Sequence, residues 1–168
     1  MGKRKDTGKN FENEIRRSLK SSRHIWWFRI QDTNDINRFV KIAVAEKQPA
    51  DFFTVYRGRP IMVEAKTSRN LSSFPLYYGA TRAIPPHQVK EGEKLVRAGG
   101  VSLIMIRREE FRNKKCYAIT PEQAKFLYSK AFDKKSVKWD WFDKNAYVVE
   151  RLKAPLRWNL QKLYEEII

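Results

Sequence analysis

The chain has 168 residues, the size of one compact domain whose core needs no disulfide or metal to hold it together. Its 35 lysines and arginines outnumber 19 aspartates and glutamates, and the formal charge of +16 makes a polyanion the expected partner. No stretch approaches the roughly 20 apolar residues of a membrane-spanning helix, and no lipidation motif is present. The composition therefore favours nucleic acid over a membrane surface as that polyanion.

Cysteine and histidine are too scarce for a structural zinc site, because Cys116 is the only cysteine and His24 and His87 are the only histidines. The absence of a disulfide framework suits a reducing cytoplasm. Cys116 is followed by residues that read as a strand, so we interpret it as an inert core residue. Residues 1–9 are basic and lack the apolar region of a secretory signal, so we expect a cytoplasmic protein.

The N-terminal third combines a helical period with a strand. Phe11, Ile15 and Leu19 are four residues apart, which predicts a helix over 10–21 with Glu12 on an adjacent face. Residues 24–30 are aromatic and β-branched and predict a first strand with large buried rings.

A hairpin is predicted next, from two β-rich runs over 52–56 and 61–65 that are separated by a glycine-containing loop over 57–60. Residues 87–98 follow two prolines and precede two glycines, which predicts a helix. The apolar run over 101–106 has the length of a buried central strand, with 115–119 pairing near it.

In the C-terminal third, Thr120 is predicted to cap a helix over 121–132 through a capping box with Gln123. Pro155 introduces a last predicted helix over 156–167. No internal repeat or linker interrupts the chain. These elements predict a single α/β domain, residues 1–168, with a mixed sheet of four or five strands flanked by helices.

Three charged residues are brought together by the predicted hairpin. Asp51 begins one strand, and Glu64 and Lys66 lie near the end of the other. Residues two apart on a strand point to the same face, so Glu64 and Lys66 present their charges together and pairing across the hairpin brings Asp51 alongside. Ala65 then faces the core, where its carbonyl oxygen can reach an ion.

This group is suited to phosphodiester hydrolysis. Two carboxylates in a partly buried site repel each other unless a cation lies between them, and oxygen ligands favour Mg²⁺ or Mn²⁺. The expected metal ligands are Asp51 and Glu64, with Glu12 as a further ligand if the first helix packs over the hairpin. Lys66 is expected to orient the nucleophile or to stabilise charge on the phosphate. The alternative is a surface hairpin with a solvated ion pair, but the apolar residues on both strands favour a central position.

The same residues resemble a known signature. Gln48-Pro49-Ala50-Asp51, followed by Glu64-Ala65-Lys66 and preceded by Glu12 on a helix, resembles the motif of the PD-(D/E)XK nuclease superfamily. The similarity is greatest to Holliday junction resolvases of the RecU and archaeal Hjc type, and it extends over 55–66, 72–76, 87–88 and 135–144. In this resemblance 135–137 and 141–144 correspond to the family's closing strand and turn.

The resemblance implies a restriction-endonuclease-like core and a homodimer that cuts opposed strands of a four-way junction with Mg²⁺, for which Mn²⁺ substitutes. It also implies that Gln88 supports the metal site or the attacked phosphate. The alternative for Gln88 is a polar residue at a helix N-terminus. Ala50 departs from the pattern, because a proline often precedes the aspartate there. Residues 31–48 correspond to the RecU stalk but are shorter, which leaves stalk-dependent recognition open.

Contacts to DNA are expected from a basic N-terminal arm, from the stalk-like segment and from a loop after the hairpin; the arm can equally be a solvated tail. Phosphate contacts position a protein without reading sequence, and tyrosines in a loop can stack on exposed bases. The other aromatic residues are interpreted as core or dimer packing. The expected nucleic-acid-binding residues are Lys3, Arg4, Lys5, Lys9, Thr33, Arg38, Lys41, Arg69, Tyr77 and Tyr78.

Three functions remain open from the sequence. The first is a structure-selective junction endonuclease, the second a duplex-specific endonuclease of the restriction or repair type, and the third a nucleic-acid-binding module without catalysis.

Overall fold

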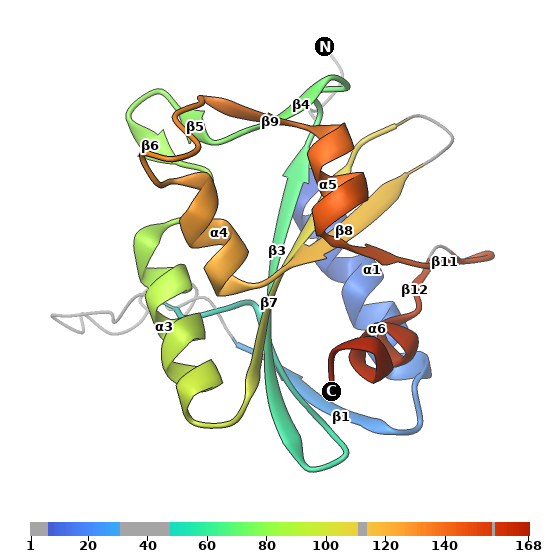
Figure 1. The fold of residues 1–168 in the computed structure, drawn as a ribbon. Coiled ribbons are helices and arrows are strands. Elements are labelled where there is room, and N and C mark those ends of the chain that lie inside the picture. Colours follow the sequence, from blue (N-terminus) through green and yellow to red (C-terminus); the bar gives the residue numbers. More distant parts are fainter. Residues whose placement is uncertain (1–6, 31–47, 111–113, 156) are drawn as a thin grey trace, which may run out of the picture.

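A six-stranded sheet forms the centre of the protein (Figure 1). The computed structural model describes residues 7–30, 48–110, 114–155 and 157–168. In spatial order, the strands are β1 (Ile25–Arg29), β2 (Phe52–Tyr56), β3 (Arg59–Ser68), β7 (Val101–Arg108), β8 (Lys115–Ile119) and β10 (Tyr147–Val149). Only β3 and β7 are parallel. The predicted mixed sheet is confirmed, but the expected number of four or five strands was too low.

Helices cover both faces of this sheet (Figure 1). Short two-stranded antiparallel sheets, called ribbons below, lie in the segments between the helices and the strands of the main sheet. The described helices are α1 (Thr7–Ser21), α3 (Pro86–Arg97), α4 (Pro121–Leu127), α5 (Trp139–Asn145) and α6 (Leu160–Ile167). The ribbons pair β4 (Ser73–Pro75) with β9 (Ser136–Lys138), β5 (Tyr77–Tyr78) with β6 (Thr81–Arg82), and β11 (Arg151–Leu152) with β12 (Arg157–Trp158). Among these helices, none combines the length and the apolar character that crossing a bilayer requires.

Two hydrophobic cores lie on opposite faces of the sheet. The first packs α1 and α6 against β3 through residues such as Phe11, Leu163 and Val63. The second packs α3, α4 and α5 against the other face, with Ile104 and Phe142 among its members. Successive residues of β7 alternate between these cores, as a strand covered on both sides requires. In β3, Ile61 and Val63 belong to the first core.

The helical period of the first helix is confirmed. Phe11, Ile15 and Leu19 are at most 1% exposed, and the helix begins at Thr7, three residues before the predicted start. Cys116 is fully buried in β8, as expected for a core residue, and burial raises the pKa of its thiol. The capping box at Thr120 is also confirmed, since its side chain accepts the backbone N–H of Gln123 while the Gln123 side chain accepts the backbone N–H of Thr120.

Several predicted elements were wrong in detail. In β1, Trp26 is 61% and Phe28 46% exposed, because β1 lies at the edge of the sheet rather than within it. The helix after Thr120 ends at Leu127 instead of continuing to 132. Residues 141–144 lie in α5 rather than in a turn. The last helix begins at Leu160, because Arg157 and Trp158 pair with β11 first and Asn159 provides the cap.

Candidate active site

The hairpin of β2 and β3 places the central residues. Arg57 and Gly58 both have positive φ, 49° and 77°, which suits a two-residue turn between antiparallel strands. Arg59 and Pro60, predicted as loop, therefore already belong to β3. The resulting register brings Asp51 across from the middle of β3, beside Glu64 and Ala65.

Asp51 is fixed to β3 by two hydrogen bonds. Its backbone N–H donates to the carbonyl oxygen of Val63 at 3.2 Å, and its Oδ2 accepts the backbone N–H of Ala65 at 2.8 Å. On its other side, the backbone N–H of Ile30 donates to the Asp51 carbonyl oxygen at 2.9 Å. The carboxylate is therefore held at the opening of the hairpin, as the sequence predicted.

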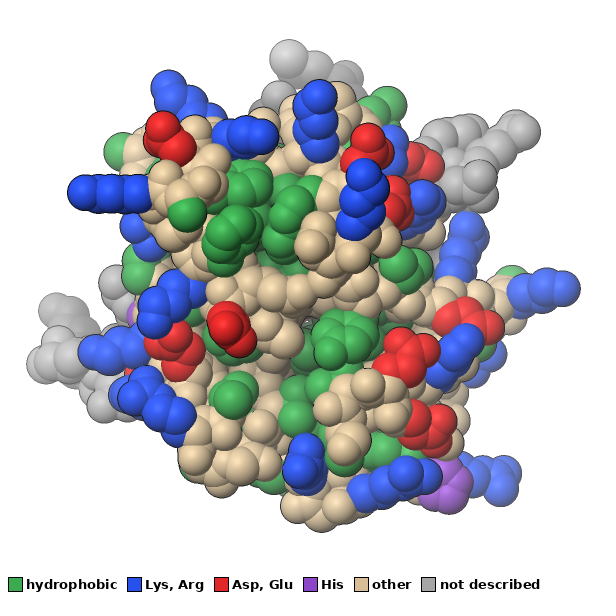
Figure 2. Space-filling model, viewed as in Figure 1, with side chains coloured by type: hydrophobic (Ala, Val, Ile, Leu, Met, Phe, Trp, Pro, Cys, Tyr) green, Lys and Arg blue, Asp and Glu red, His purple; other side chains and the backbone are tan. Residues whose placement is uncertain are grey.

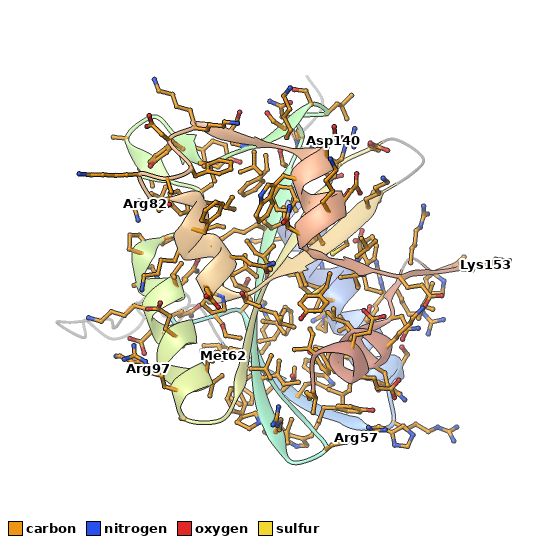
Figure 3. The ribbon with its side chains drawn as sticks, in the orientation of Figure 1. Arg57, Met62, Arg82, Arg97, Asp140 and Lys153 are labelled. Atoms are coloured by element: carbon orange, nitrogen blue, oxygen red, sulfur yellow. The ribbon has the colours of Figure 1, made fainter. Side chains whose placement is uncertain are left out.

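Glu64 and Lys66 lie on one face of β3. Lys66 Nζ is 2.8 Å from Glu64 Oε1, and their side chains are 21% exposed for Lys66 and 8% for Glu64. Met62, two residues before Glu64, lies on the α3 side of β3 (Figure 3). Glu64 and Lys66 follow the same alternation, so this ion pair lies on the α3 side, whereas Ala65 packs against the core beneath α1.

Gln88 reaches this ion pair from the first turn of α3. Two prolines precede it, and Pro86 starts the helix, which is the position where proline is tolerated. The side chain of Gln88 hydrogen-bonds Glu64. Its Oε1 is buried without a hydrogen-bond partner, so one oxygen at the site has no partner from the described protein atoms.

Burial raises the proton affinity of both carboxylates. Burial raises the pKa of Asp51 to about 6, the negative charge of Glu64 adds to that effect, and the Ala65 N–H, Lys66 and Arg29 oppose it. Burial also raises the pKa of Glu64, against the opposing effects of Lys66 and Gln88. Clustered buried carboxylates with raised pKa values are typical of sites that bind cations or transfer protons.

Glu12 lies at the margin of the site. Its negative charge contributes to raising the pKa of Glu64, while its Oε2 is 2.5 Å from Arg29 Nη2. Arg29 also lowers the pKa of Asp51, so it belongs to the electrostatics of the site. Sequence reasoning missed Arg29. In the sequence, Arg29 stands near the end of the aromatic run, and a long connection separates it from Asp51. Only the pairing of β1 with β2 shows that the two residues are close.

The donor set fits a divalent cation. Asp51 and Glu64 supply anionic oxygens, and Gln88 Oε1 is a buried neutral oxygen without a hydrogen-bond partner. Within residues 7–30, 48–110, 114–155 and 157–168, no three acidic, histidine or cysteine side chains gather closely enough to hold a metal. Asp51 and Glu64 are therefore the two carboxylates available to a cation, and Glu12 is paired to Arg29 beside them.

The structure places some of the expected DNA contacts. Tyr77 is 37% and Tyr78 57% exposed on the β5–β6 ribbon, where the Tyr77 ring packs edge-on against Tyr128 with centroids 5.6 Å apart. Lys9 and Arg69 are exposed, on α1 and after β3. The remaining predicted contacts lie outside the described residues: Lys3, Arg4, Lys5, Thr33, Arg38 and Lys41. With them lie nearly all of the stalk-like segment over 31–48 and most of the arm over 1–9.

Comparison with known proteins adds three findings. The family model "Recombination protein U" (RecU) matches residues 7–161. A Holliday junction resolvase RecU from Shouchella clausii (strain KSM-K16) is 40% identical over 57 residues, which cover 34% of this chain and only 25% of that relative. The structure of Archaeoglobus fulgidus Hjc, a Holliday junction resolvase from an archaeal hyperthermophile, aligns with a TM-score of 0.53 at 14% identity, covering 84% of this chain and 95% of Hjc. This likeness shows a shared fold.

Proposed function

Because the chain belongs to the RecU family, we propose that it is a Mg²⁺-dependent endonuclease that resolves four-way DNA junctions in the cytoplasm. The observation that carries the proposal is the convergence of Asp51, Glu64, Lys66 and Gln88 at the opening of one hairpin. The formal charge of +16 supports a polyanionic substrate.

A divalent cation bound by Asp51 and Glu64 would make a coordinated water more acidic and offset negative charge on the scissile phosphate. Lys66 is already fixed beside Glu64 at 2.8 Å, so its ammonium can donate to the attacking water or to a phosphate oxygen without reorganising. Gln88 orients the Glu64 carboxylate and keeps one amide oxygen available to the site. Glu12, which is paired with Arg29, would be a further ligand of that cation.

Resolution of a junction requires cuts on two opposed strands, so we propose that the chain acts as a homodimer with one site per protomer. Residues 1–9 and 31–48, with Arg69, Tyr77 and Tyr78, are the proposed contacts to the junction. Sedimentation of the free protein checks the dimer, and a monomer that stays monomeric on junction DNA would contradict it.

Cleavage of a labelled four-way junction, beside a linear duplex of the same sequence, tests the proposed reaction. With Mg²⁺ or Mn²⁺ we expect paired cuts in the junction and little cutting of the duplex. Equal cutting of both substrates would instead indicate a duplex-specific endonuclease, and absence of cutting would indicate a binding module.

Substitutions of the carboxylates separate catalysis from binding. Asp51→Asn and Glu64→Gln should abolish cleavage while leaving junction affinity intact, because lysines and arginines carry the binding. Glu166→Gln, which alters an exposed glutamate on α6, is the matched control and should cut at the wild-type rate. If either site variant also cuts at that rate, the altered residue does not belong to the catalytic group.

A further inference from the structure

A groove lined by aromatic residues lies between α4 and α5, away from the candidate active site. Figure 2 shows hydrophobic side chains gathered in this region, with lysine and arginine side chains around them. The aromatic residues of the groove are Phe126, Phe132 and Trp141. Phe126 is 46% exposed, and its ring centroid is 5.8 Å from that of Phe132. None of the residues lining the groove belongs to the group around Asp51.

Lysines surround these rings. The groove over α5 continues into a second one beside the β5–β6 ribbon, and Lys134 and Lys135 line both. The two grooves together present Lys130, Lys134, Lys135, Lys138 and Lys144 against three acidic residues, Asp133, Asp140 and Glu122. All five lysines are exposed, and the structure shows none of them in an ion pair with a described carboxylate. The surface therefore carries an excess of positive charge beside aromatic rings.

The segment that carries the lysines is held rigidly. The backbone N–H of Leu76 donates to the carbonyl oxygen of Lys135 at 2.9 Å, and β9 pairs with β4 directly after it. Trp139 Nε1 donates to the carbonyl oxygen of Asn70 at 3.0 Å, which fixes the start of α5. Lys134 Nζ lies 5.6 Å from the centroid of the Phe132 ring. The backbone that carries these lysines is thus anchored, which reduces the entropy lost on binding.

Phe132 and Trp141 are half-buried and pack against the second core with part of their surface, and Phe126 is the most exposed of the three rings. Phe142 and Trp139 fill the space beneath α5 and are nearly fully buried, whereas Phe126 projects outward from α4. An exposed aromatic cluster with a charged rim is typical of an interaction surface. The lysines favour an anionic partner, and the aromatic rings favour a partner with planar rings that can stack on them.

We propose that this lysine–aromatic groove binds single-stranded nucleic acid. Bases stack on aromatic side chains regardless of sequence, while lysines follow the phosphate backbone. A duplex keeps its bases stacked inside and would leave the rings of Phe126, Phe132 and Trp141 unused. The inference does not depend on the proposed nuclease activity, because the groove shares no residue with the active site.

Binding of a fluorescein-labelled oligo-dT in EDTA, which prevents metal-dependent cleavage, tests this inference. Phe126→Ala should weaken binding roughly tenfold, as expected for one lost stacking contact. Lys134→Ala with Lys144→Ala should lower the slope of log K against log salt by about 1.4, at about 0.7 per contact with a single strand. Lys20→Ala with Lys153→Ala is the matched control; Lys153 lies at the far edge of the molecule (Figure 3) and should leave the slope unchanged.

An oligonucleotide carrying 5-iodouracil locates the contact independently of these variants. Photocrosslinks are expected at Phe126, Phe132 or Trp141. Crosslinks confined to other residues, or unchanged binding by both groove variants, would overturn the proposal. An equal loss of affinity for a blunt duplex would also overturn it, since the groove would then recognise phosphate alone. If an acidic peptide occupies the groove while oligo-dT does not, the partner is a protein instead.

Discussion

The metal-free fold opposes the ionisation of Asp51. Its pKa is about 6 in the folded chain, against an ordinary value of 3.8, because burial and the nearby Glu64 disfavour the charged form. A raised pKa means that the folded state binds the proton more tightly than the unfolded state does. Ionised Asp51 therefore destabilises the metal-free protein at neutral pH.

Asp51→Asn should consequently stabilise the metal-free protein at pH 7, by roughly 1–2 kcal/mol after allowance for partial exposure. The amide oxygen can still accept the Ala65 N–H. The gain should decrease as the pH falls through 6 and vanish below about 3.8, where the carboxyl is protonated in both states. Urea denaturation in EDTA at several pH values measures it.

Asp140→Asn is the control for this measurement, since the Asp140 side chain is exposed and its substitution should change the stability little. A loss of stability in Asp51→Asn at pH 7 would mean that Asp51 stabilises the metal-free fold through its charge.

At the scale of single residues, the sequence predicts the positions that local periodicity determines. Glu64 and Lys66 share a face because strands alternate, and the hairpin turn at Gly58 places Asp51 beside them. Arg29 could not be recognised in this way. Its link to Glu12 joins a strand to a helix, and its effect on Asp51 depends on the pairing of two strands that are distant in sequence.

Among the elements, α1 is held by a buried ionic cluster. Arg107 of β7 is 1% exposed, lies 2.5 Å from Glu14, also pairs with Glu109, and stacks over Phe11 at 4.8 Å. The indole N–H of Trp158 donates to Glu14 at 3.2 Å. This cluster fixes the helix that carries Glu12.

Arg107→Ala should lower the free energy of unfolding by roughly 3–5 kcal/mol, because it leaves two carboxylates without their buried partner. Arg57→Ala is the matched control, since its 3.8 Å contact to Glu165 is exposed and should contribute about 0–1 kcal/mol. Urea denaturation compares the two. Equal effects would show that burial of the Arg107 pair is not what stabilises α1.

The packing of α3 depends on a glycine. A Cβ at Gly92 would lie 2.5 Å from Ser102 Oγ and 2.8 Å from Pro121 Cγ. Gly92→Ala should therefore cost roughly 1–3 kcal/mol through overpacking, and it should slow junction cleavage because α3 carries Gln88. Adding Ser102→Ala should recover part of the stability measured by thermal unfolding. A stable, fully active Gly92→Ala would show that α3 can shift without disturbing the site.

Elements were predictable where their signals are local, as at Thr120, whose cap needs only residues three apart. They were not predictable where the structure of a segment depends on the elements packed or paired with it. The aromatic run of β1 suggested burial, but its position at the sheet edge exposes Trp26. The last helix starts later than its pattern suggests, because the pairing of Arg157 and Trp158 with β11 competes with helix formation.

For the whole molecule, the charge of +16 predicts how binding responds to salt. Affinity for a four-way junction in EDTA should fall steeply with log salt, with a slope of about 0.9 for each phosphate contacted. Fluorescence anisotropy across a salt series measures that slope. Binding that is insensitive to salt would contradict an electrostatic interface.

The number of strands in the sheet is also a property of the whole molecule. A mixed α/β sheet could be inferred from the alternation of predicted strands and helices, but β10 is a three-residue strand that exists only because β8 offers it an edge. Such short strands carry too little pattern to be recognised before their neighbours are known.

The position of β3 between β2 and β7 should slow the hydrogen exchange of its backbone amides. Its backbone is paired on both sides, and its residues 61–63 face helices on both faces of the sheet. Amide protons of Val63 and of the residues beside it should therefore exchange with deuterium only when the whole domain unfolds, whereas those of β1, at the edge, should exchange through local opening. Glu64 and Lys66 thus stand on a nearly immobile strand, and adjustment to a substrate falls to the more loosely held partners, Arg29 and Glu12.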